Sequence, residues 1–91
     1  MIMTEHFLKT WPEYFQAVWD GTKTFEARKN DRDFKIGDTL ILREFDPKTQ
    51  EYSGRYIFKE VTYLISEPFA KDGHVIMALG DVDETPCLTK R

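Results

Sequence analysis

Cysteine and long apolar runs are scarce in this sequence, and each scarcity excludes a class of protein. The one cysteine, Cys87, excludes an internal disulfide and a cysteine-based metal cluster. No apolar run approaches the roughly 20 residues of a membrane-spanning helix, and no signal peptide is recognisable, so we expect a cytoplasmic protein with no membrane contact. Ser-His-Asp, HExxH and glycine-rich phosphate-loop signatures are also missing, so no common catalytic motif assigns an activity.

Basic residues are too few for a general polyanion binder. A net charge of −3 contrasts with the strongly basic surface that such proteins carry. A local basic cleft is still compatible with it, because the distribution of charge matters more than its sum. Asp31 and Asp33 flank Arg32 and are better suited to position it than to hold a divalent metal, which needs more oxygen ligands. We therefore expect no metal and no cofactor.

Length and composition indicate one small globular domain. The 91 residues leave no room for a second core, and a hydrophobic fraction of 41% suffices for one. We expect this domain to occupy residues 1–80 and a polar C-terminal tail to occupy residues 81–91. We also expect a monomer.

One helix is predicted, over about residues 11–20. The sequence TWPE at residues 10–13 predicts a capping box, in which Thr10 and Glu13 satisfy free backbone groups. Gly21 predicts a left-handed C-cap. Apolar residues recur at helical spacing, which predicts one buried stripe with Trp11, Phe15 and Trp19 in the core. The stripe contains Trp11, Tyr14, Phe15, Val18 and Trp19.

Alternating and apolar segments predict five strands. In the first strand we expect Phe7 to face inward, and in the second we expect Phe25 and Ala27 to be buried and Glu26 to lie on the polar face. The fourth strand is long enough to predict a bulge near residues 59–60. These features predict an α+β, mainly β fold, a small barrel or highly curved sheet of about five strands with a helix capping one end. The strands are expected at residues 5–9, 24–29, 39–45, 55–65 and 74–79.

The segment of residues 21–38 carries the densest charge. Lys23, Glu26 and Arg28 fall together, which indicates either a self-satisfied salt-bridge network or a polar binding surface. Gly37 and Asp38 are predicted to form a structural turn. His6 and His74, each isolated in the sequence, are predicted to be hydrogen-bonded rather than catalytic. Three tyrosines are expected to pack in the core or at its rim, with base stacking as the alternative: Tyr52, Tyr56 and Tyr63.

The pattern G-x-K-T-x-E-x-R at residues 21–28, followed by F-K-x-G-D at residues 34–38, resembles the ASCH superfamily, which has a PUA-like β-barrel fold. The likeness spans residues 5–79 and is greatest to a small bacterial and phage branch of predicted RNA-binding proteins. It implies a cleft beside the barrel, between the helix and the following strand. Lys23, Glu26 and Arg28 match the motif and would line this cleft. Further candidates flank it in the sequence: Lys9, Asn30 and Arg32.

Two functions from different classes follow. The first is an RNA- or nucleotide-binding module, in which cationic side chains hold phosphate and Glu26 orients Arg28 or accepts from a base. The second is a small amidohydrolase acting on a modified nucleoside, as one branch of the resembled superfamily does with a Lys, a Thr three residues later and a distant Glu. Here Lys23 matches, but Glu26 occupies the Thr position. Two neighbouring cations also keep Glu26 ionised, which favours binding over catalysis. Binding of a host protein by a phage accessory protein is a third possibility.

Overall fold

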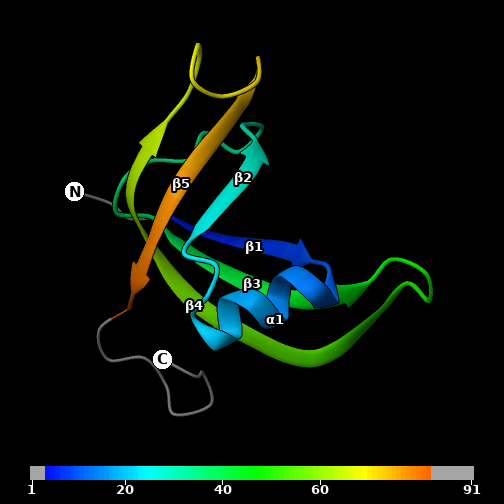
Figure 1. Ribbon diagram of the computed structural model, residues 1–91. Coiled ribbons are helices and arrows are strands. Elements are labelled where there is room, and N and C mark those ends of the chain that lie inside the picture. Colours follow the sequence, from blue (N-terminus) through cyan, green and yellow to red (C-terminus); the bar gives the residue numbers. More distant parts are fainter. Residues whose placement is uncertain (1–3, 83–91) are drawn as a thin grey trace.

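One curled five-stranded sheet wraps around a single helix in this computed structural model, which describes residues 4–82 (Figure 1). The strand order across the sheet is β1-β3-β4-β5-β2, with β1 parallel to β3 and every other pair antiparallel. The prediction of an α+β, mainly β fold with five strands and one early helix is therefore confirmed. The elements are β1 (Glu5–Thr10), α1 (Pro12–Asp20), β2 (Phe25–Lys29), β3 (Thr39–Asp46), β4 (Glu51–Ile65) and β5 (His74–Asp81).

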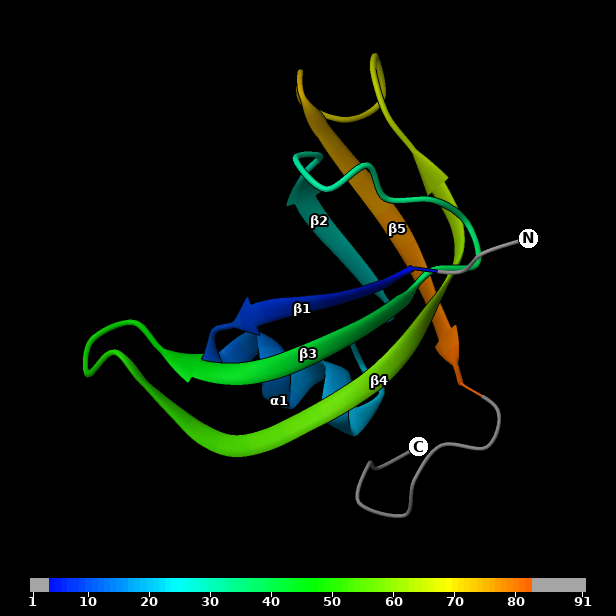
Figure 2. The ribbon, with the colours of Figure 1, turned by 180° about the vertical axis from the view of Figure 1, so that it is seen from behind.

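The long strand β4 curls the sheet into a half-barrel. Its first part pairs with β3 and its last part with β5, so one strand belongs to both halves of the sheet (Figures 1 and 2). The register against β5 shifts between Val61 and Tyr63, slightly later than the predicted bulge. At this bulge Gly80 leaves space for the side chain of Thr62, because an added Cβ at Gly80 would lie 2.7 Å from the Thr62 methyl carbon.

The core fills the concave face of the sheet beneath α1. The helix contributes Phe15 and Val18, both fully buried, and Trp19 packs partly buried beside them. Strands β3, β4 and β5 contribute aliphatic side chains from their inner faces, as their apolar sequences predict. The buried cluster comprises Leu8, Phe15, Val18, Phe34, Leu40, Leu42, Ile57, Val61, Val75 and Met77.

The start of α1 differs from the prediction. Trp11 is the N-cap residue with an extended backbone, and its side chain is 52% exposed, so its assignment to the core is wrong. The helical period does not govern a residue that precedes the helix. The capping box is also wrong, because Thr10 belongs to β1, where it pairs with Glu44. Gly21 does end the helix in the left-handed conformation, at φ 86°.

The orientation of β1 is the reverse of the prediction. His6, Leu8 and Thr10 face the interior, while Phe7 is 57% exposed. The reason is that His6 finds a buried partner, since its Nε2 donates to Asp38 Oδ2 at 2.8 Å and its ring packs on Phe34. A polar ring that is hydrogen-bonded inside the protein costs little to bury.

Asp38 anchors the turn that precedes β3, as predicted. Its carboxylate accepts hydrogen bonds from His6 and from the backbone N–H groups of Thr4 and Lys35, and the neighbouring Gly37 takes a φ of 98°. Burial by itself raises the pKa of Asp38, but the hydrogen bonds from His6, Lys35 and Thr4 outweigh it and place the pKa below its usual 3.8.

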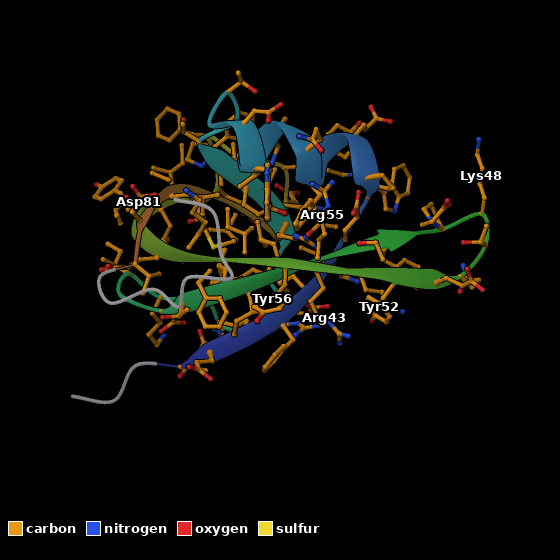
Figure 3. The ribbon with its side chains drawn as sticks, turned by 90° about the horizontal axis from the view of Figure 1, so that it is seen from below. Arg43, Lys48, Tyr52, Arg55, Tyr56 and Asp81 are labelled. Atoms are coloured by element: carbon orange, nitrogen blue, oxygen red, sulfur yellow. The ribbon has the colours of Figure 1, made fainter. Side chains whose placement is uncertain are left out.

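Arg55 fastens α1 to the sheet. Its guanidinium donates to Glu44 on β3 at 3.0 Å and to Gln16 on α1 at 2.9 Å. It also lies 4.9 Å from the ring centroids of both Phe15 and Trp19. In Figure 3, Arg55 lies on the helix side of β4. The hydrogen bond from Arg55 lowers the pKa of Glu44, so this link stays charged at neutral pH.

The C-terminal boundary also moves. Asp81, predicted to begin a polar tail, is the last residue of β5 and accepts from Lys59 Nζ at 2.9 Å. Residues 83–91, including Cys87, lie outside the described residues. No helix within residues 4–82 has the length and apolar character needed to cross a membrane.

Replacing Phe15 and replacing Trp11 should have unequal effects on stability. Phe15→Ala removes a fully buried ring and should cost about 3–5 kcal/mol of unfolding free energy. Trp11→Ala truncates a half-exposed ring and should cost under about 1 kcal/mol. Urea unfolding monitored by circular dichroism measures both. Equal losses for the two variants would contradict the observed start of α1.

Asp38 should make the protein sensitive to acid. Because its folded-state pKa lies below the unfolded value, the stabilisation is complete above about pH 4 and is lost as pH falls through the folded-state pKa. Asp38→Asn should therefore be less stable at neutral pH and lose less stability on acidification. Thermal unfolding between about pH 2 and 7 measures this, with exposed Asp31→Asn as the matched control. Parallel acid profiles for wild type and Asp38→Asn would contradict the assignment.

Candidate functional site

The two edge strands of the sheet, β1 and β2, face each other across the open side of the half-barrel (Figure 1). No backbone ladder joins them within the part of the chain that the structure describes. Arg28 on β2 instead donates to the carbonyl oxygen of Lys9 at 2.9 Å and to Thr10 Oγ1 at 3.3 Å. Arg32, in the loop after β2, donates to the carbonyl oxygen of Phe7 at 2.9 Å. Guanidinium groups thus satisfy carbonyl groups that an edge strand leaves free.

The alternation of β2 is as predicted, but its buried face is not. Glu26 is only 4% exposed and Phe25 is 47% exposed, so the charged face points inward and the prediction of the polar face is wrong. Glu26 is buried because both of its oxygens are bound: Oε1 accepts from Lys23 at 3.0 Å and Oε2 from Arg28 at 2.7 Å. A buried carboxylate is tolerated when it is paired and hydrogen-bonded in this way.

Lys23 and Arg28 each bind the backbone as well as Glu26. Lys23 Nζ also donates to the carbonyl oxygen of Phe25 at 2.7 Å and lies 4.8 Å from the centroid of that ring. Arg28 uses Nε for Glu26 and Nη2 for β1. The three motif residues therefore form one connected network, which fixes their side chains before any ligand arrives.

This network forms one wall of a cleft of about 380 Å³. The cleft lies where the end of β1, the start of α1 and β2 meet, and it brings together four of the candidate residues: Lys9, Lys23, Glu26 and Arg28. Its volume falls within the range of small-molecule sites. The lining residues are Lys9, Thr10, Trp11, Tyr14, Lys23, Phe25, Glu26, Ala27 and Arg28.

The other two candidates lie outside this cleft. Asn30 holds the loop after β2, since its Oδ1 accepts from the Phe34 N–H at 3.1 Å and its N–H donates to Gly73 at 2.8 Å. Arg32 lines an adjoining groove, which shares Lys9 and Arg28 with the cleft. Asn30 therefore positions the loop, while Arg32 extends the positive surface.

Three aromatic side chains of the cleft were not among the predicted site residues. Trp11, Tyr14 and Phe25 are each about half exposed at its rim, and the rings of Trp11 and Tyr14 stack with centroids 6.2 Å apart. The sequence did contain a signal, because Trp11 precedes Pro12 and so stands before the helical stripe that was used to place it in the core.

The arrangement can bind but offers little for metal chemistry. Two cations, Lys23 and Arg28, hold the carboxylate of Glu26, and three half-exposed rings line the same cleft. Within residues 4–82 no group of three or more His, Cys, Asp or Glu side chains is placed to hold a metal ion. Fold and site together define a small α+β half-barrel protein with a mixed cationic and aromatic cleft.

The comparison with known families assigns the chain to one of them. Residues 5–79 match the family described as "Domain of unknown function (DUF3850)", and the chain belongs to this family. A relative in Escherichia phage P2, the "Uncharacterized 12.9 kDa protein in GpA 3'region", is 37% identical over 62 residues. The aligned part covers 68% of this chain and 55% of that protein, so the chain spans about half the length of this relative.

Removing Arg28 should loosen the contact between β1 and β2. Arg28→Ala leaves Glu26 buried with one partner fewer and frees two acceptors on β1, so unfolding free energy should fall by about 1–3 kcal/mol. Amide hydrogen exchange should accelerate in β1 and β2 more than in β3. Arg43→Ala, which removes an exposed arginine from β3, is the control and should change stability by less than about 0.5 kcal/mol. Equal stability and exchange in both variants would show that Arg28 does not hold the two strands together.

Proposed function

We propose that this protein is a PUA-like RNA- or nucleotide-binding module of the ASCH type, with its binding site in the cleft between β2 and the start of α1. The observation that carries the proposal is the meeting of Lys9, Lys23 and Arg28 with exposed aromatic rings in one cleft of about 380 Å³. Cations attract phosphate and rings stack on bases, so the two features together suit a nucleotide.

Lys9 supplies the most available positive charge. No carboxylate lies within 4.0 Å of its ammonium group among the described residues, and its Nζ lies over the ring of Phe45 at 4.6 Å. Lys23 and Arg28 share one negative charge, that of Glu26, so the three cations leave the cleft positive. A locally positive cleft in a chain of net charge −3 favours a small anionic ligand over a long polyanion.

Glu26 acts in this proposal by orienting Lys23 and Arg28. Both of its oxygens already accept charge-assisted hydrogen bonds, so its first role is to hold the two cations at the cleft wall. A side chain fixed before binding loses less conformational entropy when the ligand arrives. This preorganisation suits selective capture of a phosphate.

The amidohydrolase alternative rests on the 3.0 Å contact between Lys23 and Glu26 within the cleft. A general base needs an oxygen free to take a proton, whereas both oxygens of Glu26 already accept hydrogen bonds from Lys23 and Arg28. The loop between β4 and β5, residues 66–73, contains turns and no helix that could supply a second carboxylate. Binding therefore has the better physical support.

Trp11 should report nucleotide binding directly. In a Trp19→Phe background Trp11 is the remaining tryptophan, and uridine monophosphate or short single-stranded RNA should change its fluorescence at low salt. Few phosphates are engaged, so the log–log salt slope should be shallow, on the order of −1 to −3. Trp11→Ala should weaken binding roughly 5- to 150-fold, because the base loses its stacking partner. Residue-resolved amide shifts measure the affinity of this variant.

The matched control for charge is Lys48→Ala, at the tip of the β3–β4 turn (Figure 3). Lys9→Ala should weaken binding and reduce the salt slope by about 1, while Lys48→Ala should do neither. Equal behaviour of the two variants, or no response at millimolar ligand, would contradict the proposed site. Release of a nucleoside product that depends on Glu26 would support the hydrolase instead.

A further inference from the structure

The outer face of β1, β3 and β4 carries aromatic and cationic side chains that the core does not use. The strand register places Phe7, Ile41 and Phe58 in one row across the sheet. Lys9, Arg43 and Tyr56 form the next row, and Phe45 and Tyr52 the one after it. Figure 3 shows Arg43, Tyr52 and Tyr56 on the side of β4 away from the helix, opposite Arg55.

Rings and cations alternate on this face and touch each other. The Arg43 guanidinium stacks over Tyr52 at 4.0 Å from the ring centroid, and Tyr52 in turn packs on Phe45 at 4.9 Å. Phe7 is 57% exposed and Tyr52 is 42% exposed, so each offers ring surface to a ligand. Single exposed rings are common on proteins, but a continuous set on three adjacent strands is not.

Two grooves cross this face, with volumes of about 430 and 450 Å³, and both are lined by Phe7, Arg43 and Tyr52. Their charged lining is entirely positive among the described residues: Lys9, Arg28, Arg32, Arg43 and Arg55. Lys9 and Arg28 also line the cleft of about 380 Å³ that contains Glu26, called the Glu26 cleft below, so the positive surface is continuous from the grooves to this cleft. No acidic residue lines either groove, but three of the five cations are paired with carboxylates outside the lining: Arg28 with Glu26, Arg32 with Asp31 and Arg55 with Glu44.

We infer that this face is a second nucleotide-binding surface, over which a single-stranded RNA held in the Glu26 cleft continues. The choice of ligand rests on the proposed function. Bases stack on Phe7 and Tyr52, and the phosphates between them contact Arg32 and Arg43. A single strand fits because its bases are free to stack on side chains, whereas a duplex hides its base faces.

Charge complementarity selects this occupant over a protein. An apolar partner or a second copy of the chain would bury the rings, but it would also desolvate Lys9 and Arg43, which have no carboxylate within 4.0 Å among the described residues. The phosphodiester chain supplies anions at regular intervals between flat apolar bases, which matches the alternation of rings and cations.

The test is the dependence of affinity on RNA length in the full chain, with oligouridylates from one nucleotide to about eight. Affinity of wild type should rise at least tenfold over this range. Tyr52→Ala and Arg43→Gln should each remove most of the gain and leave the affinity for uridine monophosphate unchanged. Tyr52→Phe keeps the ring and should keep the gain. Tyr63→Ala removes a more exposed tyrosine at the far end of β4 and is the control.

The outcomes separate this surface from the cleft. If uridine monophosphate binds but longer RNA gains no affinity through Tyr52 or Arg43, the outer-face surface is overturned and the Glu26 cleft stands. If uridine monophosphate fails to bind but longer RNA binds through Tyr52 and Arg43, the surface stands and the cleft falls. Equal affinity for duplex and single-stranded RNA would overturn the stacking surface. A change of molar mass in Tyr52→Ala, measured by light scattering, would also overturn it, because the face would then join copies of the chain. Arg43→Gln, at an exposed position, keeps the test valid if Tyr52→Ala does not fold.

Discussion

The hydrogen bonds from Arg28 to β1 are the interaction on which the closure of this half-barrel depends. The sheet curls until its two edge strands face each other, yet no ladder pairs them in the described chain. Arg28 spans the gap, and Glu26 beneath it holds the guanidinium in place at 2.7 Å. A guanidinium can do this because its several donors lie in one rigid plane and stay charged.

Closing the sheet with side chains rather than backbone leaves a cleft. Backbone pairing would bring β1 and β2 within about 4.8 Å of each other and leave no space between them. An arginine holds the strands farther apart, and the space is lined by the same charged residues. The alternatives of a salt-bridge network and a binding surface are therefore not exclusive here. The network that satisfies Glu26 is also the wall that would meet a ligand, in keeping with preorganised polar sites.

Sequence patterns predicted the elements of this fold more accurately than their orientation. The helix, its end at Gly21, the five strands and the turn at Asp38 follow from local signals, and all are observed. The inward faces of β1 and β2 were predicted in reverse, because Phe7 and Phe25 are more apolar than His6 and Glu26. Each polar side chain is nevertheless buried, because it finds a hydrogen-bonding partner: Asp38, far away in sequence, for His6, and Arg28 and Lys23, both close in sequence, for Glu26.

The sequence by itself determined the number, the order and the approximate place of the strands and the helix, although β4 begins at Glu51 and not at residue 55. It also determined that Lys23, Glu26 and Arg28 fall close together. These features depend on period, capping and turn chemistry, which act over a few residues. Only the tertiary structure decided that Lys9 joins them and that Asn30 serves the loop. Such outcomes depend on the curl of the sheet, which brings β1 against β2 and sets which face of each strand is inside. A strand's pattern records that its two faces differ, while its neighbours in space decide which face is buried.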